Sequence, residues 1–423
     1  MSPRSRRRFL VDAVGTAAFL PAALASLNEL QSALGAASPS SESYWTTIRE
    51  QFPFHEDKVP MNAANLCPSP LVVSRRVTTL TQDIDVDCSF NNRDKFKSLL
   101  ETSREKVAQH LGVSSDEIAL VRNTSEANNV INNGLKLSPG DEVVLWDQNH
   151  PTNNVAWDVR AARFGLTVTR VRTPPQPEDV SELVDAFKQA LGSKTRVLAV
   201  TQVSNVSGLR LPIKELTELA HARDIFVHVD GAQTWGALDI NLRELGCDSY
   251  AASAHKWFMG PKEVGLLYVN QDRIKDIWPN VVAPGWGSDV EPDVRGARKF
   301  ESLGQRDDAA LAAVGTAVDF HRTIGVKRTA DRVQELAAAL KSELAQFGCK
   351  LITPSRPQLS GGVCIMDVPL GHRAEVFKRL YEDTGIAAST SGGLRLCPHI
   401  YNTREHIDRA VSGVRAMRKL IAG

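Results

Sequence analysis

Strand-like and helix-like segments alternate regularly between residues 141 and 229, and this alternation constrains the fold more than any other feature. The strand-like segments are short β-branched runs, and amphipathic stretches separate them. The alternation predicts an α/β fold, with a largely parallel sheet and helices on both of its faces. The predicted strands cover 143–146, 166–171, 196–203 and 225–229, and the predicted helices cover 153–164, 181–191 and 213–223.

Polar residues follow several of the predicted strands directly. Thr124 and Ser125 come after the strand-like run 118–121, and His150, Asn205 and Asp230 follow or end later strands. In open α/β sheets, ligands bind at the carboxyl ends of the strands. Polar residues at several separate strand ends therefore favour one shared crevice over scattered surface loops.

The segment from His228 to Lys256 carries the most specific chemistry. It reads His-Val-Asp-Gly-Ala-Gln at 228–233 and Ser-Ala-His-Lys-Trp at 253–257. A lysine among apolar and small residues can lose its charge by desolvation and become a nucleophilic amine. Asp230 suits the opposite task of holding a protonated ring nitrogen. A lysine Schiff base with an acid opposite the ring is how proteins hold pyridoxal 5′-phosphate (PLP).

Other interpretations of these residues are less specific. His228 and Asp230 lie two residues apart on one strand face, but no further ligands with metal-like spacing follow, so no metal site is expected. Thr124 and Ser125 at a helix start would form an anion cradle or a plain N-cap. Asn65 lies in the proline-rich loop 61–70, which either lines an active site or forms a surface turn.

Taken together, these motifs resemble the class V aminotransferase group of fold-type I PLP enzymes, over roughly residues 60–420. The group includes cysteine desulfurases, isopenicillin N epimerase-like proteins and kynureninase-like proteins. The motifs that carry the resemblance lie at 122–129, 228–233 and 253–257. The resemblance implies a fold-type I architecture, with a mainly parallel seven-stranded-type sheet in the large domain and a smaller C-terminal α+β domain. It also implies a PLP-dependent enzyme.

The resemblance also implies roles for individual residues. Lys256 would form the Schiff base, Asp230 would pair with the pyridine nitrogen, and His150 would stack on the ring. Gln233 and Asn205 would lie near the phenolic oxygen. The phosphate would be held by Thr124, Ser125, Ser253 and His255, and by Ser288 from a neighbouring subunit, which implies a homodimer. Arg395 would bind the substrate α-carboxylate through its planar fork, with Asn65 as a second candidate substrate contact.

Departures from the family pattern concern the substrate. Cysteine desulfurases carry a cysteine on a loop ahead of the carboxylate arginine, but residues 386–393 contain none. Gln305 stands where isopenicillin N epimerase-like proteins often have threonine in a Gly-Thr-Arg-Asp motif. We therefore expect chemistry at Cα of an amino acid or of an amino-acid end of a larger molecule, such as a secreted peptide or siderophore. A PLP-dependent C–S lyase and a non-catalytic binding protein are the alternatives.

The first residues predict export. Ser5-Arg6-Arg7-Arg8-Phe9-Leu10 precedes a short apolar stretch and a small-residue site near Ala25, as in a twin-arginine signal peptide. We expect residues 1–25 to be the signal, 26–59 a linker and N-terminal segment, 60–325 the large domain and 326–423 the small domain. The export machinery would be one partner, and the mature protein would be periplasmic or otherwise exported. The net charge of +1 gives no indication of nucleic-acid binding.

Overall fold

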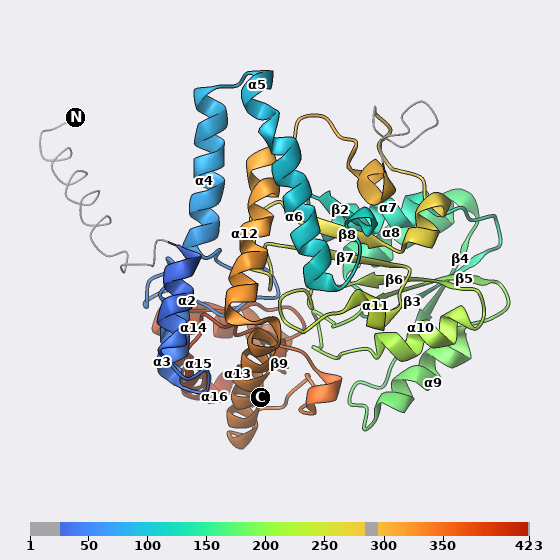
Figure 1. Cartoon of the computed structure of the whole chain (residues 1–423). Helices are drawn as coiled ribbons and strands as arrows, with labels where there is room; N and C mark the ends of the chain where they lie inside the picture. The colour runs from blue at the N-terminus through green and yellow to red at the C-terminus, as the bar shows by residue number, and fades with distance from the viewer. Residues whose placement is uncertain (1–25, 284–294, 422–423) are drawn as a thin grey trace, which may run out of the picture.

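A seven-stranded sheet forms the centre of the computed structural model, which describes residues 26–283 and 295–421 (Figure 1). β8 runs antiparallel to both of its neighbours, and the other neighbouring strands pair in parallel. The mainly parallel α/β sheet expected from the sequence is thereby confirmed. In spatial order the strands are β2 (Ile118–Val121), β8 (Gly265–Val269), β7 (Ser249–Ser253), β6 (Phe226–Asp230), β5 (Thr195–Thr201), β3 (Glu142–Trp146) and β4 (Thr167–Val171).

Helices cover both faces of this sheet. Within β3, Val143 and Leu145 enter one apolar cluster, whereas Val144 and Trp146 enter another, because successive side chains point to opposite faces. The first cluster includes residues of α7 (Thr124–Gly134) and α8 (Pro151–Phe164). The second includes residues of α6 (Lys95–Leu111), α9 (Val180–Ala190) and α10 (Ile213–His221). Parallel strands buried on both faces place their carboxyl ends at one accessible edge of the sheet.

A helical layer stands beside the sheet. α4 (Leu71–Val86) and α5 (Phe90–Arg93) lead into α6, and α12 (Asp308–Ile324) packs against both α4 and α6 (Figure 1). α4 was not predicted, because its many valine and threonine residues give a weak helix signal. The remaining short elements are α11 (Leu242–Leu245), η1 (Ser115–Glu117), η2 (Gln271–Asp276), η3 (Gly296–Glu301), η4 (Pro357–Leu359) and η5 (Leu370–His372).

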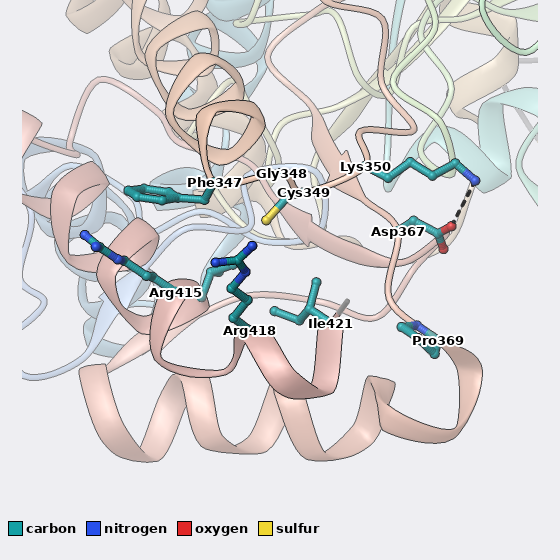
Figure 2. A pocket seen from close by; sticks show the side chains of 10 residues that line it. Phe347, Gly348, Cys349, Lys350, Asp367, Pro369, Arg415, Arg418 and Ile421 are labelled. Atoms are coloured by element: carbon teal, nitrogen blue, oxygen red, sulfur yellow. Dashed lines mark hydrogen bonds and ion pairs between the residues drawn. The ribbon is translucent and has the colours of Figure 1, made fainter. Parts of the chain in front are cut away.

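A second, smaller core gathers the C-terminal elements. Its residues come from α13 (Val326–Gln346), β9 (Cys364–Met366), α14 (Arg373–Thr384), β10 (Ile386–Ala387), β11 (Leu394–Leu396) and α15 (Arg404–Ala416). β1 (Val59–Pro60) joins this core by pairing in parallel with β10, so a segment from the N-terminal part of the chain completes the C-terminal core. The domain limits at 60–325 and 326–423 stay a prediction. The C-terminal part also contains a pocket at α16 (Arg418–Ile421), which Figure 2 shows. The residues that line this pocket include Phe347, Cys349 and Arg418.

The segment after residue 25 differs from the expected linker. It forms α2 (Leu27–Gly35) and α3 (Glu42–Arg49), and α2 packs against α12. Ser26 and Glu29 form a capping box at the start of α2, and Leu30 and Leu34 are buried in the main core. One apolar stripe and a good cap thus outweigh the alanine- and serine-rich composition. Within the described residues, the helices are too short or too polar to cross a bilayer, and the predicted signal at 1–25 lies outside them.

Candidate active site

Lys256 lies in the turn that follows β7, at the carboxyl edge of the sheet. Protein atoms enclose its amine, although part of the side chain is still reachable by solvent. Burial lowers the pKa of Lys256, the carboxylate of Asp230 opposes this shift, and the charge of Arg395 adds to it. The structure therefore brings an acid, a lysine and an arginine into one electrostatic cluster, and it favours the neutral, nucleophilic form of the amine.

Asp230 ends β6 and is buried, with an exposed fraction of 2%. Its Oδ2 accepts a hydrogen bond from Asn128 Nδ2 at 2.9 Å, and its Oδ1 accepts one from the Ala232 amide at 3.0 Å. Gly231 makes the turn after it possible, because a Cβ there would lie 1.9 Å from a ring carbon of Tyr250. The carboxylate is held by fixed donors and keeps lone pairs for a ligand nitrogen.

Gln233 follows on the same loop, and its amide orientation is unambiguous. Trp257 Nε1 donates to Gln233 Oε1 at 2.7 Å, and an indole nitrogen can only donate. Gln233 Nε2 therefore lies on the other side, where it donates to the Ala64 carbonyl at 3.0 Å. One amide hydrogen remains for a ligand oxygen, which fits the role expected for Gln233.

His150 caps the start of α8, directly after β3. Its Nδ1 accepts from the Thr152 amide at 3.3 Å, so the ring proton lies on Nε2. Burial lowers the pKa of His150, and the charges of Lys256 and Arg395 lower it further, while Asp230 raises it. A neutral imidazole coupled to these three groups belongs to the same cluster, as the order of strands predicted.

Two of the expected phosphate ligands, Thr124 and Ser253, meet at the start of α7. Ser253 Oγ accepts from the Thr124 amide at 2.8 Å and lies 2.6 Å from Thr124 Oγ1. His255 is half-buried, and burial lowers its pKa to about 4, with Lys256 and Lys262 contributing. Ser125 is more exposed and opens toward solvent. Hydroxyls at a helix start provide the donors and the positive dipole that an anion requires.

Arg395, on β11, is 4% exposed and reaches the same edge from the smaller core. It donates through Nη1 to the Asn205 carbonyl at 2.9 Å and through Nη2 to Asn62 Oδ1 at 3.0 Å. Its Nε and Asn205 Oδ1 are buried without a hydrogen-bond partner among the described residues. Asn65 is exposed, and its side chain makes no hydrogen bond to another described residue, so Asn62 is the asparagine of this loop that contacts Arg395.

Three further residues of the site, Asn62, Asn128 and Trp257, were not predicted individually from the sequence. Asn128 lies one turn after Thr124, on the same side of α7, and this spacing was the available signal for it. Asn62 had no such signal, because its position depends on a bridge that pairs residue 62 with Cys397, far along the chain.

A family model, Aminotransferase class-V, matches residues 88–417. The chain belongs to this family. Among its class-V relatives, the isopenicillin N epimerase of Amycolatopsis lactamdurans is 32% identical over 89% of this chain and 99% of that protein. A probable cysteine desulfurase of Methanothermobacter thermautotrophicus is 28% identical over 85% of this chain and 94% of that protein. A structure of C-DES, with glycine covalently linked to its PLP cofactor, matches with a TM-score of 0.79 and 24% identity over 87% and 98% of the two chains.

The residues of this class-V enzyme fit PLP. Asp230 keeps acceptor capacity for a ring nitrogen, and Gln233 keeps one amide hydrogen for an oxygen. Thr124 and Ser253 provide hydroxyls at the start of α7 for a phosphate, and Lys256 provides the amine. The fold and the cofactor expected from the sequence are confirmed. Ser288, expected to reach a neighbouring subunit's cofactor, lies outside the described residues.

The cysteines near the site are not arranged for sulfur transfer. Cys67, Cys364 and Cys397 are buried, and burial raises the pKa of the Cys67 and Cys364 thiols to about 12. Such thiols are poor nucleophiles near neutral pH. Cys88 is the exposed cysteine of the described residues, and it lies between α4 and α5, at the far end of the helical layer (Figure 1). Within the described residues, His, Cys, Asp and Glu side chains form no group of three that could hold a metal ion.

Proposed function

We propose that this class-V enzyme moves the proton at Cα of an amino acid, or of the amino-acid end of a secreted peptide or siderophore, in an epimerase- or aminotransferase-like reaction. The proposal rests on the burial of Lys256 in one electrostatic cluster with the carboxylate of Asp230 and the guanidinium of Arg395, which has an unpartnered nitrogen. The isopenicillin N epimerase relative, which the chain matches over nearly its whole length, supports the same reaction class.

Arg395, Lys256 and Asp230 have separate roles in the proposed reaction. PLP, when bound, supplies the electron sink for a bond broken at Cα. Arg395 binds the substrate carboxylate through Nε and the hydrogens that its contacts with Asn205 and Asn62 leave free. Lys256, freed by the incoming substrate amine, takes the Cα proton, because its lowered pKa leaves more neutral amine near pH 7. Asp230 holds the proton on the ring nitrogen.

The reaction is tested by incubating the holoenzyme in D₂O with a panel of amino acids and short peptides. We expect deuterium at Cα of the recovered amino acid, accompanied by inverted configuration or by formation of a keto acid, which itself carries no hydrogen at this carbon. Mass spectrometry and chiral chromatography measure these products. Release of pyruvate and thiol from cysteine conjugates would instead identify a C–S lyase. A chain that binds PLP and exchanges no Cα proton from any member of the panel would overturn the proposal.

We also propose export by the twin-arginine route. Arg6 and Arg7 precede an apolar stretch, and this route carries folded proteins, which suits an enzyme that binds its cofactor in the cytosol. Fractionation of cells should recover a periplasmic form that lacks about the first 25 residues, as the small-residue site near Ala25 predicts. The double variant Arg6→Lys, Arg7→Lys should remain inside the cell at full length. Unchanged export of that variant would contradict the route.

A homodimer is the third part of the proposal, because the family resemblance implies that Ser288 reaches the partner's cofactor. Subunits carrying Lys256→Ala and subunits carrying Ser288→Ala should be inactive or weak when each is expressed alone. Co-expression should restore activity, since one site of each mixed dimer then combines an intact Lys256 with an intact Ser288. A fully active monomer in light scattering would exclude this arrangement.

A further inference from the structure

Behind Asp230, buried side chains form one continuous chain of hydrogen bonds. Ser249 Oγ lies 2.8 Å from His228 Nδ1, and His228 Nε2 lies 3.0 Å from Asn128 Oδ1. Asn128 Nδ2 then donates to Asp230 Oδ2 at 2.9 Å. All of these side chains are at most 2% exposed. A chain so deeply buried keeps its arrangement, because each alternative would leave a polar atom without a partner.

In this chain of hydrogen bonds, the donor and the acceptor of each bond are determined. A carboxylate accepts hydrogen bonds, so Asn128 must present its Nδ2, and not its Oδ1, to Asp230. Asn128 Oδ1 therefore faces His228, whose Nε2 must carry a proton. Burial lowers the pKa of His228 to about 4, so the imidazole is neutral near pH 7 and its Nδ1 accepts. The Ser249 hydroxyl donates to that nitrogen. Asp230 and the Nε2 proton of His228 therefore require the same orientation of the Asn128 amide, although His228 does not touch Asp230.

We infer that Asn128 and His228 are positioning residues, which keep the Asp230 carboxylate charged and oriented so that its remaining lone pairs hold the proton on the ring nitrogen of bound PLP. The inference rests on the proposed function, since it concerns the same site. Hydrogen bonds donated to a carboxylate stabilise its charged form, and a charged carboxylate stabilises a protonated ring nitrogen. Ala232 donates to the other oxygen of Asp230, so each oxygen has one fixed donor.

The position of Asn128 on α7 adds a second consequence. Thr124 begins this helix, and Asn128 follows it by one turn, so one rigid element carries a phosphate ligand and the donor to Asp230. Asn132 lies one turn further along the same side of α7 and is equally buried, at 2% exposure. Its Nδ2 has no hydrogen-bond partner among the described residues. Asn132 is therefore a matched buried asparagine outside the chain that leads to Asp230.

The test uses the full-length holoenzyme, loaded with PLP that carries ¹⁵N at the ring nitrogen. The ¹⁵N chemical shift reports directly whether this nitrogen is protonated, independently of turnover. In Asn128→Leu, we expect the ring nitrogen to lose its proton about one to two pH units lower than in the wild type, the range that corresponds to one hydrogen bond to a charged group. In Asn132→Leu, the titration should match the wild type, because this variant also replaces a buried asparagine of α7 but breaks no hydrogen bond to Asp230.

Variants of His228 test the same chain one residue further from Asp230, and so do not depend on how Asn128→Leu folds. His228→Leu removes the donor that holds Asn128 Oδ1, and it should shift the ring-nitrogen titration in the same direction by a smaller amount. His228→Gln keeps a side-chain N–H at similar reach and should restore most of the wild-type titration.

The outcomes separate the two proposals. A wild-type chain that takes up no PLP overturns the proposed function and the positioning role together. A wild-type chain that binds PLP, with Asn128→Leu and His228→Leu titrating like Asn132→Leu, overturns the positioning role alone. A selective shift in Asn128→Leu and His228→Leu, with recovery in His228→Gln, supports it.

Discussion

The cofactor end and the substrate end of the active site differ in how many of their buried polar atoms have hydrogen-bond partners within the chain. At the cofactor end, Asp230 and Gln233 each hold at least two hydrogen bonds from or to fixed partners, and Asn128 is itself oriented by His228. At the substrate end, Arg395 Nε is buried without a partner among the described residues. Unpaired buried polar atoms are costly, so they indicate where a ligand completes the structure.

The origin of the residues explains this difference. The cofactor end is built from strand ends and one helix start within a single sheet, between residues 124 and 257. The substrate end joins Asn62 to Arg395, and Arg395 comes from β11, whose neighbouring leucines belong to the smaller core. A cofactor site on one rigid element can be fixed in advance. A substrate site shared between two cores can change with the substrate while the cofactor site stays the same.

Removal of the amine should have the largest effect. In Lys256→Ala, activity should fall on the order of a thousandfold or more, because the nucleophile and the Cα base are lost together. Borohydride reduction followed by peptide mass analysis should find the cofactor attached to residue 256 in the wild type and absent in the variant. Lys262→Ala is the control, since Lys262 is a nearby lysine whose amine donates to the Cys67 carbonyl and Ser69 Oγ. Attachment at Lys262 would contradict the assignment.

Acid should destabilise the cofactor end. Burial lowers the pKa values of His228 and His321 to about 4 and of His399 to about 3. His321 and His399 contact the carbonyls of Phe258 and Trp257, just after the catalytic lysine. The unfolded chain binds more protons than the folded chain between the unperturbed pKa of about 6.5 and these lowered values. Stability present above pH 6.5 is therefore lost as the pH falls toward 4.

The size of this loss should be on the order of 3 kcal/mol for each imidazole once the pH is well below its folded pKa, from a shift of about 2.5 units. Urea denaturation at a series of pH values between 7.5 and 5 measures the early part of this slope. His321→Gln keeps an N–H for the Phe258 carbonyl and removes one titrating group, so it should flatten the slope. A free energy of unfolding that does not change from pH 7.5 to 5 would show that these imidazoles are not held neutral.

Arg395 tests the substrate end. Lysine cannot replace its planar fork, because one ammonium cannot reach the Asn205 carbonyl, Asn62 Oδ1 and a carboxylate together. In Arg395→Lys, KM should rise about tenfold to a hundredfold, the range for one lost charged hydrogen bond, while PLP binding is unchanged. Steady-state kinetics and a PLP titration measure the two effects. Arg404→Lys, at an exposed ion pair with Glu343, should leave KM unchanged. Equal losses of substrate and PLP affinity in Arg395→Lys would show that Arg395 does not act on the substrate end alone.

The contrast between the cofactor end and the substrate end also explains how much of the site could be predicted from the sequence. Asp230 and Lys256 could be placed in one crevice because strand ends converge on one edge of a parallel sheet. β7 was not predicted, since Ser249–Ser253 consists of small residues and one tyrosine without a β-branched run. α2 was not predicted, because the alanine- and serine-rich composition does not show that Leu30 and Leu34 pack into a core.

The contacts at the substrate end could not be predicted for a different reason. Arg395 could be assigned from its family motif, but its partners depend on tertiary pairing between distant segments. The bridge between residue 62 and Cys397 brings Asn62, and not Asn65, to the guanidinium. Sequence patterns fix which residues share a strand face, whereas they do not fix the register between strands more than 300 residues apart.

The two asparagines of this loop therefore give the smallest and most specific test. In Asn62→Ala, Arg395 keeps only its bond to the Asn205 carbonyl, so KM should rise about fivefold to tenfold, as expected for one hydrogen bond of about 1–1.5 kcal/mol. In Asn65→Ala, an exposed side chain without a bond to another described residue is removed, and KM should stay within about twofold. Kinetics of both variants with the same substrate measure the contrast. A larger rise of KM in Asn65→Ala than in Asn62→Ala would restore Asn65 as the substrate contact and would mean that the loop moves when substrate binds.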